Sequence, residues 1–212
     1  MNIPLTDKKF LTQLKLISAE QQSNAPMKPK INFIENWLTL TEQTELWKIL
    51  NNKVSWEQPK IQIAGKRLLI PRKQAWYGDE NAHYKYSSIH CVPTPWTAEL
   101  FRLKQRLENT INFSFNSVLL NLYSNGQESM GWHSDDETEL GAEPWIASIS
   151  LGATRRFRFR LKKNHRIVHA IDLTGRSLLI MHPSVQYDWQ HALPKTKRVV
   201  EPRINLTFRY VY

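Results

Sequence analysis

Apolar and polar residues follow two different periods along the chain, and each period predicts a different kind of element. Between residues 96 and 111 the apolar side chains recur three or four positions apart, which is the spacing of one helix face. These residues are Trp96, Leu100, Leu103, Leu107 and Ile111. An earlier helix is expected to begin after Thr39 and to run through residues 41–52, because Thr39 and Glu42 have the spacing of a capping box.

Most of the remaining chain has the pattern of short strands rich in β-branched and aromatic residues. The strand-like segments are 60–71, 116–124, 145–152, 155–162, 166–173, 177–181 and 203–212. Turn-forming glycines lie at or between their ends, namely Gly126, Gly131, Gly152 and Gly175. In residues 156–161 (RFRFRL) basic and apolar residues alternate, so one face of that strand should be basic and the other apolar. Many short strands beside two helices predict an α+β fold, a double-stranded β-helix (jelly roll) with the helices packed on one sheet.

Composition limits the organisation of the chain. Residues 1–28 are polar and are expected to form an arm or linker ahead of one domain, residues 29–212. Apolar residues make up 41% of the chain but nowhere form a run near twenty, so no membrane span is expected. The first residues carry charges where a signal peptide needs an apolar stretch, and Cys91 is the single cysteine. These features favour an intracellular compartment, cytoplasmic in a bacterium or nuclear in a eukaryote.

The charge of the chain narrows the class of partner. There are 29 Lys and Arg residues against 19 Asp and Glu, which gives a formal net charge of +10. Such a charge favours a polyanionic partner, because neutralising phosphates releases counterions. Many basic proteins bind no nucleic acid, so charge alone does not decide the partner.

Three residues have the types and the order of a metal-ligand set. His133 and Asp135 are two positions apart, so in an extended segment both side chains point to the same side. His191, from a distant strand, would complete a set of two imidazoles and one carboxylate. This facial set leaves positions open on non-haem Fe(II) for a chelating co-substrate and oxygen. Zinc accepts the same ligand types, and an isolated His-x-Asp is often an ordinary surface pair, so both alternatives stay open.

The last strand-like segment places two arginines on one face. Arg203, Asn205, Thr207 and Arg209 alternate with Ile204, Leu206 and Phe208. Burying both guanidinium groups would be costly without an anion, and a dicarboxylate would relieve that cost through bidentate contacts. The alternative is an exposed edge strand with a solvated basic face.

Taken together, His133-x-Asp135, His191 and the segment 203–209 (RINLTFR) resemble the AlkB family of oxidative nucleic-acid dealkylases in order and separation. Further matching segments are 71–75 (PRKQA), 77–79 (YGD), 121–123 (NLY), 135–137 (DDE) and 147–153 (ASISLGA). They are most like the branch that includes the animal duplex-DNA repair enzyme. The resemblance covers about residues 60–212, with a basic nucleotide-recognition lid at about 58–92 and the catalytic jelly roll at about 115–212.

The resemblance implies a role for each matching residue. His133, Asp135 and His191 would be the catalytic Fe(II) ligands. In a 2-oxoglutarate pocket, Arg209 would bind the distal carboxylate and Arg203 would lie near the other end. The other residues implied for this pocket are Asn121, Tyr123, Asn205 and Thr207. Those implied to contact the substrate base are Tyr84, Tyr86, Ser87, Arg72, Gln74, Asp136 and Glu137, with Tyr86 stacking on the flipped base opposite His133.

The activity implied by the resemblance is oxidative removal of N-alkyl lesions from DNA, of the 1-methyladenine and 3-methylcytosine type. It would consume 2-oxoglutarate and O2 and release succinate, CO2 and formaldehyde, and the protein would act as a monomer. One alternative is a 2-oxoglutarate oxygenase that acts on RNA or on a protein. Another, from a different class, is a nucleic-acid-binding protein with an inactive metal site.

One position departs from the family pattern. In duplex-acting relatives a hairpin just before the PRKQA segment carries a bulky apolar finger that fills the gap left by the flipped base. Here Ala64 stands at the expected finger position. A methyl group cannot fill that gap. Unless Ile63 or the pair Leu68 and Leu69 takes the place of the finger, we expect single-stranded or mismatched substrates to be repaired faster than paired duplex.

Overall fold

The computed structural model describes residues 27–63, 65–82, 84–86 and 89–212, and two facing antiparallel sheets form its framework. The seven-stranded sheet has the order β1 (Ile31–Ile34), β13 (Leu178–Met181), β10 (Ile146–Gly152), β15 (Arg203–Arg209), β8 (Ser117–Tyr123), β4 (Lys73–Gly78) and β7 (Thr94–Pro95). The four-stranded sheet has the order β12 (Asn164–Leu173), β11 (Arg155–Leu161), β14 (Trp189–Leu193) and β9 (Met130–His133). Among the strands of the described residues, only β7 pairs in parallel, with β4.

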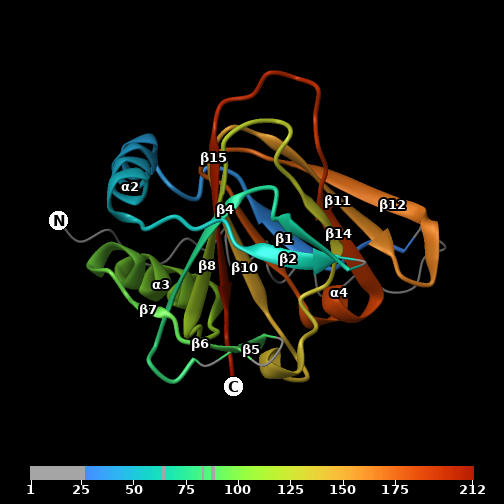
Figure 1. Ribbon diagram of the computed structural model, residues 1–212, viewed down its shortest axis with the longest axis horizontal. Helices are drawn as coiled ribbons and strands as arrows, with labels where there is room; N and C mark the ends of the chain where they lie inside the picture. The colour runs from blue at the N-terminus through green and yellow to red at the C-terminus, as the bar shows by residue number, and fades with distance from the viewer. Residues whose placement is uncertain (1–26, 64, 83, 87–88) are drawn as a thin grey trace, which may run out of the picture.

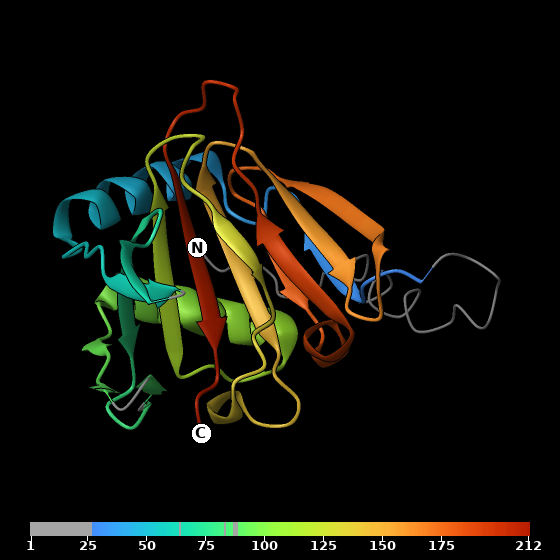
Figure 2. The same cartoon turned by 45° about the vertical axis from the view of Figure 1, so that its right-hand side comes forward.

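Two short hairpins and four helical segments complete the described part of the chain. One hairpin joins β2 (Lys60–Ile63) to β3 (Lys66–Leu69), and the other joins β5 (Tyr84–Tyr86) to β6 (Ile89–Cys91). The helical segments are α2 (Leu40–Lys53), α3 (Ala98–Ile111), the 3-10 turn η2 (Thr138–Leu140) and α4 (Pro183–Asp188). Figures 1 and 2 show α2 and α3 together on one side of the seven-stranded sheet, with the four-stranded sheet on the other.

Local signals in the sequence account for both long helices. The Thr39 side chain accepts a hydrogen bond from the Glu42 amide at 3.2 Å, and the Glu42 carboxylate accepts one from the Thr39 amide at 2.7 Å. This confirms the predicted capping box, and a cap of this kind contributes about 1 kcal/mol. The second helix begins at Ala98, slightly later than its apolar pattern, because Thr97 caps it and Trp96 lies ahead of it.

The two faces of the seven-stranded sheet differ as the alternation in β15 predicts. Ile204, Leu206 and Phe208 are fully buried in a core shared with leucines of α2 and α3. The alternate residues of β15 therefore point toward the four-stranded sheet, into the space between the two layers. The predicted α+β jelly roll with helices on one sheet is confirmed. None of the helices in the described ranges is long and apolar enough to cross a membrane.

Strand β11 follows its predicted alternation. Phe159 and Leu161 are buried, whereas Arg156 and Arg158 are exposed. Arg155 begins the strand on the same face as Phe159 and Leu161, and it is buried. Its guanidinium donates to the backbone carbonyls of three distant residues, Asn125 at 3.2 Å and Glu128 and Pro194 at 2.9 Å each. These acceptors satisfy an arginine that would otherwise be costly to bury.

The prediction of an arm over residues 1–28 concerns a segment of which residues 1–26 lie outside the described ranges. Residues 27–30 lead into β1 and contact His169 of β12 and His182, which follows β13. The carbonyl of Met27 lies 2.9 Å from Nε2 of His169, and the carbonyl of Lys30 accepts from the amide of His182 at 3.2 Å.

Candidate metal centre

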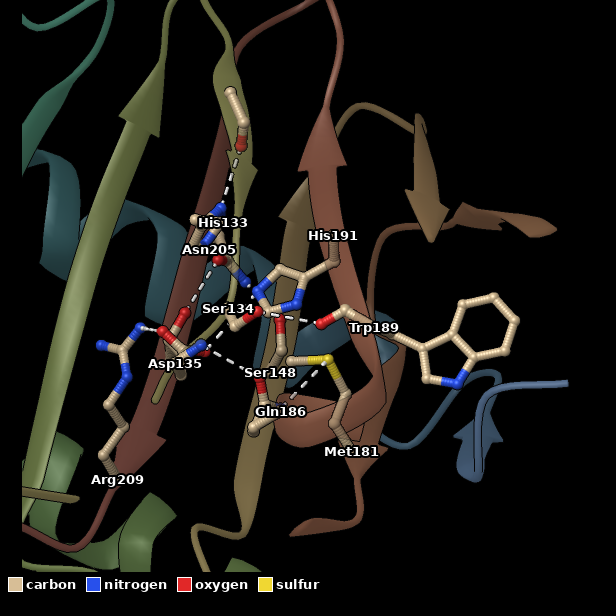
Figure 3. A network of polar contacts seen from close by, with 12 residues as sticks. His133, Ser134, Asp135, Ser148, Met181, Gln186, Trp189, His191, Asn205 and Arg209 are labelled. Carbon is tan, nitrogen blue, oxygen red and sulfur yellow. Dashed lines mark hydrogen bonds and ion pairs between the residues drawn. The ribbon is translucent and has the colours of Figure 1, made fainter. Parts of the chain in front are cut away.

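His133, Asp135 and His191 meet at one end of the space between the two sheets. His133 ends β9 and pairs directly with His191 of β14, while Asp135 lies two residues past the end of β9. One ligand atom from each of the three side chains lies within 4.8 Å of the others. Figure 3 shows the three side chains converging from two neighbouring strands. The structure therefore brings the predicted ligand set together.

The hydrogen bonds of the two histidines leave nitrogen atoms free to act as ligands. Nδ1 of His133 lies 2.9 Å from the carbonyl of Gly131, which can accept its proton and so leave Nε2 as the ligand atom. In His191, Nε2 lies 3.6 Å from the carboxylate of Asp135. Nδ1 of His191 is buried and has no hydrogen-bond partner among the residues that the structure describes.

Asp135 and His191 are held in the protonation states that metal binding requires. Burial would raise the pKa of Asp135, but the Arg209 guanidinium, 2.6 Å from its carboxylate, and the two histidines outweigh burial and bring the pKa to about 2. Burial, with the neighbouring His133, lowers the pKa of His191 to about 3. The centre therefore presents a carboxylate and a neutral imidazole at neutral pH.

A cavity of about 60 Å³ adjoins the three ligands, and both sheets line it. All six residues predicted for a co-substrate pocket lie on its wall, namely Asn121, Tyr123, Arg203, Asn205, Thr207 and Arg209. The sequence did not predict the remaining polar residue, Ser148, or the apolar residues of the wall, which are Leu119, Met130, Phe157, Leu173, Met181 and Leu193. For Ser148 and these apolar residues, the alternation of the strands could have predicted only that their side chains point inward.

Arg203 places a buried positive charge on the cavity wall, which favours an anionic ligand. Its side chain is 2% exposed, and one terminal nitrogen donates to Ser150 Oγ at 2.9 Å. Nε of Arg203 has no partner within the described ranges of the chain. Burial lowers the pKa of Arg203 to about 10, which still leaves the group charged at neutral pH. A buried guanidinium with an unpaired donor fits a carboxylate ligand well.

The two arginines of β15 have different partners in the structure. Arg209, for which the resemblance implies contact with the distal carboxylate of the co-substrate, donates to Asp135 at 2.6 Å and so lies beside the metal ligands. Arg203, at the opposite end of β15, has no such contact and pairs with Ser150. Alternation gives the face on which a side chain lies, while its partner depends on which loop comes to lie opposite it, so the contact between Arg209 and Asp135 could not be predicted from the sequence.

The residues predicted to contact the substrate are more scattered. Arg72 lines the cavity and its Nε donates to Asn121 Oδ1 at 2.8 Å, whereas Gln74 lies in β4 with its backbone paired to Glu57. Asp136 accepts from Nζ of Lys162 at 2.8 Å. The other four predicted residues are Glu137, which is exposed, Tyr84 and Tyr86, whose β5 backbone alone is described, and Ser87, which lies outside the described residues.

Comparison with known proteins adds three relatives. Residues 30–209 match the model of the 2OG-Fe(II) oxygenase superfamily. The chain is 42% identical to the alpha-ketoglutarate-dependent dioxygenase alkB homolog 3 of Bos taurus, over 83% of this chain and 64% of the relative. It is 42% identical to the DNA oxidative demethylase ALKBH2 of Mus musculus, over 72% of this chain and 66% of that relative. With the human ALKBH2 it shares 37% identity, over 80% of this chain and 69% of the human protein.

The chain thus spans slightly less than two thirds of the length of the first two relatives. Two solved structures share its fold. OsALKBH1 superposes with a TM-score of 0.62 at 18% identity, covering 86% of this chain and 99% of that one. A prolyl hydroxylase from Trichoplax adhaerens, in complex with a hypoxia inducible factor peptide, has a TM-score of 0.61 at 15% identity, covering 97% and 93%. At these identities the likeness concerns the fold alone.

Proposed function

Because the chain belongs to the 2OG-Fe(II) oxygenase superfamily and, within it, to the AlkB family, we propose that it is a dioxygenase that removes N-alkyl groups from nucleic-acid bases. The observation that carries the proposal is the joint geometry of the site. One ligand atom from each of the three proposed metal ligands lies within 4.8 Å of the others, beside a cavity whose wall includes the fully buried Arg203. A metal and a dicarboxylate together match this arrangement of charges.

In this proposal His133, Asp135 and His191 would hold Fe(II). The bound iron would supply oxygen activation coupled to decarboxylation of 2-oxoglutarate, so that hydroxylation of an N-methyl carbon releases formaldehyde and the free base. The protein's part is to bind, orient and exclude water. Arg209 keeps Asp135 anionic, and Arg203 would bind the distal carboxylate of the co-substrate.

Hydrogen bonds between neighbouring strands keep the polar wall of the cavity rigid. Asn205 donates to Ser148 Oγ at 2.7 Å and to the carbonyl of Ile149 at 3.1 Å. Thr207 donates to Oδ1 of Asn205 at 3.0 Å. These contacts fix the donors and acceptors before the co-substrate arrives, which lowers the entropic cost of binding it.

The substrate class is proposed from charge and from the relatives. A net charge of +10 suits a nucleic acid, and the ALKBH2 relatives carry the name DNA oxidative demethylase. A base must leave its stack to reach the iron, and an alkylated base that pairs badly leaves at a lower cost. One chain supplies all three ligands and the whole cavity wall, so we also propose that the monomer is active, in the reducing intracellular compartment that a lone Cys91 suits.

A direct test measures succinate production with Fe(II), with and without methylated oligonucleotides. We expect 1-methyladenine or 3-methylcytosine in DNA to stimulate succinate release strongly, and mass spectrometry to detect the unmethylated base. Methylated RNA and a hydroxylatable peptide are the matched comparisons. Stimulation by RNA or by the peptide, without stimulation by DNA, would replace the proposed substrate with one of the alternatives.

Tyr86 provides a prediction about base recognition. In this proposal the face of its ring stacks on the flipped base, so Tyr86→Phe should keep the activity. Stacking on an aromatic side chain contributes about 1–3 kcal/mol per base, so Tyr86→Ala should lower kcat/KM for the lesion about tenfold or more. Uncoupled succinate release without oligonucleotide is the control and should not change. Equal kinetics for the Ala variant and the wild type would exclude the stacking role.

A second prediction concerns the tip of the β2–β3 hairpin. Ala64 lies outside the described residues, next to Gly65, whose φ of 80° is typical of a tight turn. Without a bulky side chain there, we expect single-stranded and mismatched substrates to be repaired faster than paired duplex. Ala64→Phe should raise the rate on duplex, whereas Gln62→Phe, on the same hairpin, should not. Faster repair of paired duplex by the wild type would refute the inference about the missing finger.

A further inference from the structure

The turn that carries Asp135 is fastened to the segment just before His191. The amide of Asp135 donates to Oε1 of Gln186 at 3.0 Å, and the hydroxyl of Ser134 donates to the carbonyl of Trp189 at 2.9 Å. Figure 3 shows both contacts on the side of Asp135 that faces away from Arg209. The backbone and the carboxylate of this ligand are therefore held from two directions.

Gln186 is itself held rigidly. It lies in α4 with an exposed fraction of 0%, and its side-chain nitrogen faces the sulfur of Met181 at 4.0 Å. Its backbone carbonyl accepts from Nζ of Lys162 at 2.7 Å. The same ammonium group contacts Asp136 at 2.8 Å, so Lys162 joins α4 to the turn that follows Asp135.

Strand pairing explains why this turn needs such a contact. His133 is held by its pairing with His191, but β9 ends there, and the pairing shifts register beyond His191. Asp135 therefore lies beyond the ladder, and its buried amide requires another acceptor. Among the described residues Gln186 is that acceptor, and a fully buried amide side chain is unfavourable unless it is used in this way.

We propose that Gln186 is a positioning residue for the metal. By accepting from the Asp135 amide it holds the carboxylate in the orientation for ligation before any metal is bound, and so it sets the metal affinity of the centre. This inference rests on the proposed function, because it takes the three ligands to be a metal site. Arg209 orients the carboxylate from the other side, so the two contacts act on different atoms of the same residue.

The test is a calorimetric titration of the full chain with Mn(II), a redox-stable probe, in parallel with thermal unfolding of the metal-free protein. Gln186→Met keeps the length of the side chain but removes its carbonyl. Changes in such outer contacts of a metal ligand typically cost 10–100-fold in affinity, and we expect a loss of about that size. Gln186→Glu retains the acceptor and should recover part of the affinity.

Gln190→Met is the matched control, because Gln190 lies four residues further on and contacts Arg160 at 2.8 Å instead of the metal-ligand turn. It should bind Mn(II) like the wild type. If Gln186→Met does not fold, Ser134→Ala removes the second fastening contact and should also weaken Mn(II) binding. A Gln186→Met or Ser134→Ala protein with wild-type Mn(II) affinity would overturn the proposal, whatever its melting temperature. A wild type that binds no Mn(II) would overturn the proposed function as well.

Discussion

Alanine at His133, Asp135 or His191 is expected to abolish turnover and to leave the fold intact. Each substitution removes one of the three ligands that converge within 4.8 Å, and two remaining ligands would hold the metal poorly. The core is formed elsewhere, mainly by the leucines of α2 and α3 against the seven-stranded sheet, so the secondary structure should persist. Formaldehyde release from a methylated oligonucleotide and the circular dichroism spectrum together measure the two effects.

Two variants sharpen this experiment. His165→Ala changes an exposed histidine of β12 and should retain full activity. Asp135→Asn keeps the volume of the side chain and its contact distance to Arg209, so it separates loss of the ligand charge from loss of packing. If any of the three alanine variants kept iron-dependent activity near that of the wild type, that residue would not be a ligand.

Substitution of Arg203 is expected to act on 2-oxoglutarate, and substitution of Arg209 on the metal. A hydrogen bond to a charged group contributes about 1.5–3 kcal/mol, so Arg203→Gln should raise KM for 2-oxoglutarate roughly tenfold to a hundredfold. The KM for the oligonucleotide and the affinity for Mn(II) alone should change little. Arg209→Gln removes the partner of Asp135 and should weaken Mn(II) binding even without co-substrate.

Arg158→Gln is the control for charge, because Arg158 is an exposed arginine of β11 that lines no part of the cavity. Its KM for 2-oxoglutarate should equal that of the wild type. The opposite pattern, with Mn(II) affinity lost in the Arg203 variant and 2-oxoglutarate affinity lost only in the Arg209 variant, would support the order of the two arginines that the resemblance implies.

Strand β15 shows how far local pattern reaches. The alternation of Arg203, Asn205 and their neighbours with apolar residues predicted two opposite faces, and the structure has them. That prediction succeeds because successive side chains of any strand point to opposite sides. The capping box at Thr39 succeeds for a similar reason, since its partners lie three residues apart.

Arg155 and Arg72 show where local pattern stops. Arg155 lies on the inward face of β11 by alternation, and it can be buried there because three backbone carbonyls from other segments surround its guanidinium. Arg72 belongs to a segment predicted to contact the substrate, yet its side chain lies on the cavity wall beside Asn121. No spacing within the sequence announces either set of partners.

The sequence by itself predicted the helices, the strands and the three residues that we propose as metal ligands, because capping and alternation act over a few residues and the resemblance to a family rests on short motifs. Only the tertiary structure decided that Arg209 contacts the carboxylate of Asp135 and that Gln186 accepts a hydrogen bond from its backbone amide. These contacts join residues 74 and 51 positions apart. They are strong only in a buried, low-dielectric site, and that site exists only where the two sheets face each other.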